Sequence, residues 1–456
     1  MKSRFIVLVL LASALLVPSA AWGRSPESSP TGDPPRADDT VATARSGEPL
    51  RAAPSRLSVL VVPLYWTESP TTEPRYQLAD MERELTRTQS WFSRVSRGRH
   101  TMSYHLLDWK QASENLCPRS RHSKATKIAR QRAKAVGVDA SRYQRLMVMM
   151  PQCHARSWGQ MPGNVTWILS IPARSTIVHE LGHNLGLHHA NSLQCGYGGI
   201  AVPVGGWCKR EEYGDRWDEM GSSTGQFSVP ILKKLGWAGN IVTVTKSGHW
   251  DLAAAEDSGD GIQALKIRAG GKDYWVEYRR DSSVTSSGNA RPGLIVRRSG
   301  GPGGAFDIID GFPGDPDPWT LGDNADLVNA AMHTEVPIKT PEGIEIVLLS
   351  AEGDPTAGVW VTIPGSPAPS APVITSIERL NLVTVRVHFE RGPYNRSLRT
   401  QGFQFRVGSK IQRVYVGPYD RTFDASVGPG DKQVSVREIS LSGASKWSVA
   451  KRAPKA

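Results

Sequence analysis

The sequence predicts a multidomain protein in which an α/β domain is followed by all-β sandwich domains. Its 456 residues correspond to about three domains at roughly 150 residues each. Up to about residue 190, apolar β-branched segments alternate with segments of helical periodicity, as in an α/β domain. From about residue 239 onward, short segments of alternating polarity are separated by turn residues, which is typical of sandwiches and barrels. Hydrophobic residues make up 39%, enough for real cores, so a wholly disordered chain is excluded.

The first 23 residues have the features of a secretory signal peptide. Lys2 and Arg4 precede an apolar run over 5–17, and Ala21-Trp22-Gly23 fits the small-x-small rule of signal peptidase. The run is shorter than the ~20 residues that span a bilayer, and no stop-transfer pattern follows, which disfavours the alternative of a short membrane anchor. We therefore expect a secreted or periplasmic protein with no stable membrane anchor.

Residues 24–56 are rich in Pro, Ser, Gly and Arg and have no apolar periodicity, so they predict a disordered linker or a short propeptide. The α/β domain is expected over 57–240, with buried strands at 57–64, 102–106 and 145–150. A helix is expected at 78–95. Its apolar face consists of Leu78, Met81, Leu85 and Trp91.

A run of basic residues without an acid lies between Pro118 and Val138: Arg119, Arg121, Lys124, Lys127, Arg130, Arg132 and Lys134. The formal net charge of the chain is +12, so a nucleic-acid-binding face deserves consideration. No aromatic side chain is interleaved and no binding motif is present, so we predict instead a solvated helix face, with Ile128, Ala129 and Val136 inward, and no nucleic-acid partner.

Four cysteines occur, and outside the cytosol they are expected to form two disulfides. Three pairings exist; we favour the local one, Cys117–Cys153 and Cys195–Cys208. A zinc site of four thiolates is the alternative, but no CxxC spacing supports it.

A β-rich domain is predicted at 241–363, a Pro-rich linker at 364–372 and a last β domain at 373–456. In the last domain apolar residues recur at period two: Val383, Val385, Val387 and Phe389, then Phe403, Phe405 and Val407, then Val434 and Val436. Its size, its linker and its ending resemble a fibronectin type III module, a resemblance that carries no chemistry.

The segment with catalytic potential runs from His179 to His189. His179 and His183 are four residues apart, so on a helix they occupy one face and can share a Zn²⁺ ion. Gly186 can adopt the left-handed conformation that ends a helix, which would let His189 return as a third ligand. Three protein ligands leave one position for water, as in a catalytic zinc site. His188, one place earlier, is interpreted as a bystander.

This pattern predicts hydrolysis of an amide bond. One zinc ion activates a water molecule and polarises the scissile carbonyl, while Glu180 acts as general base and later protonates the leaving amine. We therefore expect a zinc endopeptidase acting on proteins or peptides, including extracellular or cell-wall proteins.

The segment resembles the zinc-binding motif of the metzincin metallopeptidases. The block at 212–221 is similar to the gametolysin peptidase family, as are Trp91-Phe92 and Leu235-Gly236-Trp237. The resemblance implies a metzincin-like zincin fold for 57–240, zinc ligands His179, His183 and His189, general base Glu180, and Met220 in a structural methionine turn. It extends more weakly over 241–363.

The chain also departs from the family pattern. Residues 24–56 contain no cysteine, so a cysteine switch is not expected. No tyrosine follows Met220 directly; Tyr213 is either a transition-state donor or a packing residue. Asp215 and Asp218 are expected to cap turns or to bond to a ligand histidine, not to bind metal.

Aspartates recur in a loop at Asp307, Asp310, Asp315, Asp317, Asp323 and Asp326, which raises the question of a Ca²⁺ site. Their spacing fits no EF-hand, so a solvated loop is favoured. Two rival functions remain: a secreted adhesion protein with a degenerate peptidase domain, and a zinc amidase acting on cell-wall material.

Overall fold

The computed structural model describes residues 53–66, 76–197, 200–201, 204, 208–280, 293–309, 338–349, 355–365, 370–392, 400–414, 421–427, 432–440 and 443–455. The expected signal peptide at 1–23 and most of the expected linker at 24–56 lie outside these residues, as do five of the six loop aspartates. Within them the chain is mostly β-sheet, with four α-helices. No described helix is both long enough and apolar enough to cross a membrane.

The N-terminal region is built on a six-stranded sheet with the order β2-β1-β4-β6-β5, in which β3 also pairs with β1. Its strands are β1 (Arg56–Tyr65), β2 (Thr101–Leu106), β3 (Lys110–Gln111), β4 (Arg145–Met149), β5 (Trp158–Gly159) and β6 (Val165–Ile168). The strands run parallel except β5, which pairs antiparallel with β6 at the edge. This sheet agrees with the strands expected from the apolar segments.

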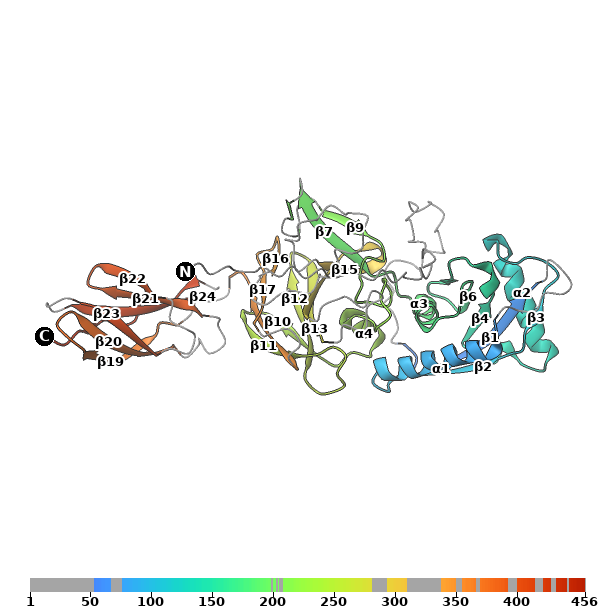
Figure 1. The fold of residues 1–456 in the computed structure, drawn as a ribbon, viewed down its shortest axis with the longest axis horizontal. Coiled ribbons are helices and arrows are strands. Elements are labelled where there is room, and N and C mark those ends of the chain that lie inside the picture. The colour runs from blue at the N-terminus through green and yellow to red at the C-terminus, as the bar shows by residue number, and fades with distance from the viewer. Residues whose placement is uncertain are drawn as a thin grey trace, which may run out of the picture. The chain divides into compact units, whose positions relative to one another are not determined.

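Alternate residues of β1 face two different cores because side chains of a strand point to opposite faces. Val59 and Val61 pack with α1 (Leu78–Val95) and α3 (Arg174–Asn184), whereas Leu60 and Val62 pack with α2 (His122–Ala135). Figure 1 shows α1 running alongside β2, with α2 near β1 and β4. The central strand is therefore buried on both faces, as its mostly apolar sequence predicts.

Helix α1 has the bounds expected from its periodicity, and its buried side chains include Met81, Leu85 and Trp91. Helix α2 buries Ala125, Ala129 and Ala133 and leaves most of its basic residues exposed. The expected inward position of Val136 is wrong: the helix ends at Ala135, and Val136 is 42% exposed.

A second, 12-stranded sheet has the order β16-β17-β18-β11-β12-β13-β14-β15-β7-β8, with β10 beside β12 and β9 beside β7. Its early strands are β7 (Asn191–Tyr197), β8 (Ile200–Ala201) and β9 (Cys208–Glu211). The later ones are β10 (Asn240–Val244), β11 (Gly248–Ala253), β12 (Ile262–Ala269), β13 (Lys272–Arg279), β14 (Gly293–Ser299), β15 (Phe306–Ile309), β16 (Ile338–Lys339), β17 (Glu345–Leu348) and β18 (Thr356–Thr362). In the sequence, helix α4 (Val229–Leu235) follows β9 and precedes β10.

This sheet takes strands from both sides of residue 240. Strand β7 pairs in parallel with β15, although more than a hundred residues separate them in the sequence. The core around α1 and α3 also includes Ala264, Trp275 and Phe306 of the later strands. The two regions therefore share both a sheet and a core.

The C-terminal region is a two-sheet β-sandwich around one apolar core. One sheet contains β19 (Val373–Arg379), β20 (Thr384–Glu390) and β23 (Thr422–Ser426). The other contains β21 (Thr400–Val407), β22 (Lys410–Val414), β24 (Gln433–Ser440), β25 (Gly443–Ala444) and β26 (Lys451–Arg452). Val385, Val387, Phe403, Phe405 and Val436 fill the core, as their period-two spacing predicts. Val383, the first residue of that series, is instead 50% exposed, because it precedes β20.

All four cysteines are paired, Cys117 with Cys153 and Cys195 with Cys208, which is the pairing favoured from the sequence. The first disulfide ties the segment before α2 to the segment after β4, and the second joins β7 to β9. Disulfides of this kind fit a protein of an oxidising, extracellular compartment.

Candidate metal centre

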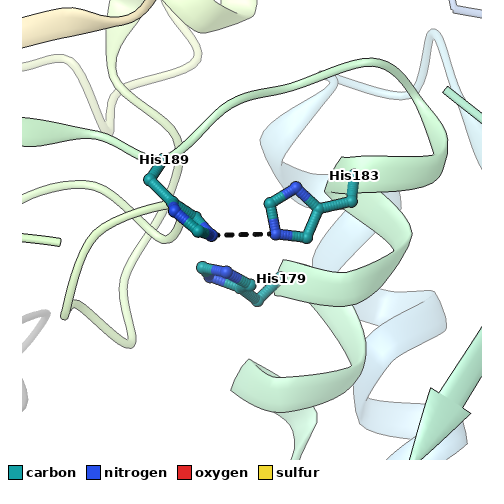
Figure 2. Close-up of side chains that lie close together, drawn as sticks. All are labelled: His179, His183 and His189. Carbon is teal, nitrogen blue, oxygen red and sulfur yellow. Dashed lines mark hydrogen bonds between the residues drawn. The ribbon is translucent and has the colours of Figure 1, made fainter. Parts of the chain in front are cut away.

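The three histidines singled out from the sequence lie together. His179 and His183 belong to α3, where a spacing of four residues places them one turn apart on the same face. The helix ends at Asn184, and Gly186, with φ of +86°, turns the chain so that His189 returns to the same place. Figure 2 shows the three rings brought together from α3 and the segment that follows it. One nitrogen from each ring lies within 4.8 Å of the other two.

Each imidazole is oriented by a hydrogen bond on the side away from this centre. His179 Nδ1 donates to the Glu219 carbonyl at 2.8 Å, and His183 Nδ1 donates to the Leu187 carbonyl at 2.8 Å. His189 Nδ1 bonds to the carboxylate of Glu212. A carbonyl or carboxylate oxygen only accepts, so each Nδ1 carries the proton and each Nε2 turns its lone pair to the centre.

These lone pairs make the donor set fit a cation. His183 Nε2 and His189 Nε2 are 3.1 Å apart, although neither has a proton to share when both Nδ1 atoms donate. Two nitrogens bound to one tetrahedral Zn²⁺ at about 2.0–2.1 Å are about 3.4 Å apart. The three imidazoles therefore match zinc in donor type, and the spacing of the His183–His189 pair is close to the value expected on that ion.

Burial keeps the two helical histidines neutral. Burial, together with the neighbouring imidazoles, lowers the pKa of His179 to about 4 and that of His183 to about 3. At neutral pH both rings are uncharged, which is the form that binds metal.

Glu180 follows the first histidine and is almost fully buried, at 6% exposure. Its carboxylate accepts a hydrogen bond from the Gly159 backbone N–H of edge strand β5, while its Oε2 has no hydrogen-bond partner. Burial raises the pKa of Glu180 to about 8. A buried carboxylate oxygen without a partner is costly, and a water molecule or substrate atom at the centre would satisfy it.

Gly159 permits this approach of β5 to α3. A Cβ at this position would lie 2.3 Å from the Glu180 carbonyl oxygen, so only glycine fits. The role of Gly159 was missed from the sequence, because a lone glycine in a two-residue strand gives no periodic signal.

Met220 lies under the ligand helix. It is fully buried, and its Sδ would be 2.4 Å from a Cβ added to Gly182, which sits between the two helical histidines. The backbone N–H of Met220 donates to Asp218 Oδ1 at 2.8 Å, so Asp218 closes the turn that places the methionine.

Tyr213 lies against the third histidine. The centroids of the Tyr213 and His189 rings are 3.8 Å apart, and Tyr213 has a φ of +61°. The ring contact accounts for a packing role; a role as transition-state donor stays a prediction. His188, the interpreted bystander, is half-buried and is not one of the three clustered histidines.

Asp215 and Asp218 cap turns, as expected, by accepting from the backbone N–H of Trp217 and of Met220. The carboxylate of Glu212, which bonds to His189, was missed from the sequence. Glu212 precedes Tyr213 directly, and an acidic residue near a third ligand could have been considered as its partner. Asp307 was expected in a solvated loop, and this is wrong: it lies in β15, is fully buried, and both its oxygens accept bonds from Arg210 at 2.8 Å. Among the described residues, the three histidines form the only cluster suited to a metal.

Comparisons with known proteins add little about this site. No family model matches the chain, and no curated protein matches it. Among solved structures it is similar to a protein described as a myokine, with 20% identity over 19% of this chain and 98% of that one (TM-score 0.17). It is also similar to the sixth fibronectin type III domain of human fibronectin type III domain containing protein 3, with 17% identity over 20% of this chain and 92% of that one (TM-score 0.17).

A third similar structure contains the three fibronectin type III domains FN1–FN3 of chicken CNTN1, with 12% identity over 48% of this chain and 68% of that one (TM-score 0.20). Two of these three solved structures are fibronectin type III domains. At these TM-scores the likenesses carry no argument about the histidine centre.

Proposed function

We propose that this chain is a secreted, zinc-dependent endopeptidase of the metzincin type, with a zincin-like catalytic domain. The observation that carries the proposal is the convergence of three oriented imidazoles beside a buried glutamate with a free carboxylate oxygen. The two disulfides support secretion.

His179, His183 and His189 would hold the metal, and Glu180 would handle the proton. A bound zinc ion supplies Lewis-acid polarisation of the scissile carbonyl and lowers the pKa of a water molecule to about 7. With a divalent cation held by the three imidazoles, Glu180 would ionise more readily than its burial alone allows. Glu180 then takes a proton from the attacking water and returns it to the leaving amine, while Gly159 N–H holds the carboxylate in place.

The test is a cleavage assay on the secreted protein with casein and a peptide library, together with analysis of its zinc content. We compare wild type with Glu180→Gln, which keeps the shape of the side chain and removes the base. Glu438→Gln is the matched control, because Glu438 is also buried but lies in the C-terminal sandwich.

We expect about one zinc per wild-type chain, and unchanged zinc content with a loss of cleavage of at least a hundredfold in Glu180→Gln. Cleavage by Glu180→Gln at the wild-type rate would refute the assigned base. A wild-type protein that binds zinc but cleaves no peptide would favour an adhesion protein or a cell-wall amidase instead.

A further inference from the structure

The turn at 215–229 positions the first histidine. Its Glu219 carbonyl accepts the hydrogen bond from His179 Nδ1, and its Met220 packs beneath Gly182 of the same helix. The orientation of His179 Nε2 therefore depends on where this turn lies, because the imidazole rotates with the acceptor of its Nδ1 proton.

The start of the turn is tied to the second sheet by one arginine. Arg297 of β14 donates from Nε to Asp215 Oδ2 at 2.5 Å and from Nη2 to Asp215 Oδ1 at 3.1 Å. Asp215 Oδ1 also accepts from the Trp217 backbone N–H at 2.8 Å. The planar guanidinium thus binds the Asp215 carboxylate with two hydrogen bonds, and this carboxylate also fixes the first residues of the turn.

The end of the turn is tied to the same sheet through Glu277 of β13. Arg297 Nη1 donates to Glu277 Oε1 at 2.5 Å, and Glu277 Oε2 accepts from the Val229 backbone N–H at 2.7 Å. Arg279 donates to Glu277 Oε1 at 2.8 Å and to the Phe227 carbonyl at 3.2 Å. Arg297 therefore bridges the carboxylates that hold the two ends of the turn.

This network is fully enclosed. Arg297, Asp215, Glu277 and Arg279 are each at most 1% exposed. A buried ion pair is weak evidence for stability, since apolar packing of the same volume often stabilises a core as well. An arginine that bonds to two carboxylates does fix their relative positions. Its N–H donors reach both carboxylates only when all three groups lie in one arrangement.

We infer that Arg297 is a positioning residue of the histidine centre, acting through Asp215 and the turn on the imidazole of His179. The inference rests on the proposed zinc site. It gives the region at 241–363 a role in that site, because β13 and β14 supply the side chains that fix the turn at 215–229 beneath α3.

The experiment compares Arg297→Lys with wild type and with Arg391→Lys. Lysine keeps the positive charge but cannot bond to both carboxylates with a planar fork. Arg391 is the matched control, because it pairs with buried Glu438 in the C-terminal sandwich, whose core is separate from the histidine centre. Three quantities are measured: the zinc dissociation constant by chelator competition, the visible spectrum of the Co²⁺-loaded protein, and the urea midpoint of the metal-free protein.

We expect Arg297→Lys to weaken zinc binding by about 10- to 100-fold and to change the Co²⁺ spectrum, which reports ligand geometry. Arg391→Lys should lower only the urea midpoint. A folded Arg297→Lys protein with wild-type zinc affinity and spectrum would overturn the inference, even if its urea midpoint falls.

If Arg297→Lys does not fold, Glu277→Gln takes its place, since the amide oxygen still accepts from Val229 while the charge that faces Arg297 is lost. A several-fold loss of zinc affinity is then expected, and unchanged affinity overturns the inference. A wild-type protein that takes up no zinc refutes the proposed function and the inference together, whereas zinc uptake unaffected by these changes refutes only the inference.

Discussion

A methyl group added at Gly182 tests the packing beneath the proposed ligands. In a helix interior, Gly→Ala ordinarily stabilises by about 1 kcal/mol. Here the new Cβ would lie 2.4 Å from Met220 Sδ and 3.3 Å from its Cε, so the methionine or the helix must shift. Overpacking of this kind costs about 1–3 kcal/mol, so we expect Gly182→Ala to lower the free energy of unfolding by up to about 2 kcal/mol.

The assay is urea unfolding of the metal-free protein, with zinc affinity measured in parallel. Gly259→Ala is the matched control, because a Cβ at that position meets no atom within 4 Å. In a Met220→Ala background the clash is absent, so Gly182→Ala should become neutral or stabilising, with a coupling energy of about 1–3 kcal/mol. A Gly182→Ala protein that is more stable than wild type by about 1 kcal/mol, as helix propensity alone predicts, and keeps full zinc affinity would refute the placement of Met220 under the helix.

Two further predictions concern the surroundings of the ligands. Glu212→Ala removes the acceptor of the His189 Nδ1 proton, so the zinc affinity measured by chelator competition should fall about tenfold. Glu212→Gln keeps an acceptor and should lose less zinc affinity. Equal zinc affinities in wild type and both variants would contradict this role of Glu212. Burial raises the pKa of Glu180 and of Glu219 from 4.5 to about 8 in the metal-free protein. The folded state then keeps protons that the unfolded chain has released, so the free energy of unfolding falls as pH rises from 4.5 to 8. The free energy of unfolding is measured by urea unfolding at pH 5 and pH 8 with a chelator present. Glu180→Gln should reduce its decrease between these two pH values by on the order of 3 kcal/mol. An unchanged decrease would show that the pKa of Glu180 is not raised.

The candidate ligands could be predicted from the sequence because their arrangement is local. A spacing of four residues places His179 and His183 on one helix face whatever surrounds the helix, and Gly186 supplies the turn that returns His189. The strands and α1 were found for the same reason, since burial of one face imposes a period of two or 3.6 residues.

The groups that orient those ligands could not be predicted in this way. Arg297 and Asp215 are 82 residues apart, and their contact depends on where β14 lies within the 12-stranded sheet. Gly159 meets Glu180 only because β5 pairs with β6 at the sheet edge beside α3. Such contacts follow from strand order and register, which local periodicity does not encode.

The sequence by itself determined the three histidines, the adjacent glutamate and the β-sandwich pattern of the C-terminal region, because each depends on residues close in the chain. Only the tertiary structure decided that the region after residue 240 shares a sheet and a core with the region before it. It also placed the buried charges of β13 and β14 under the turn that holds His179. The physical reason is that a buried arginine needs carboxylate partners. The fold brings these partners together from positions far apart in the sequence, so local patterns do not reveal them.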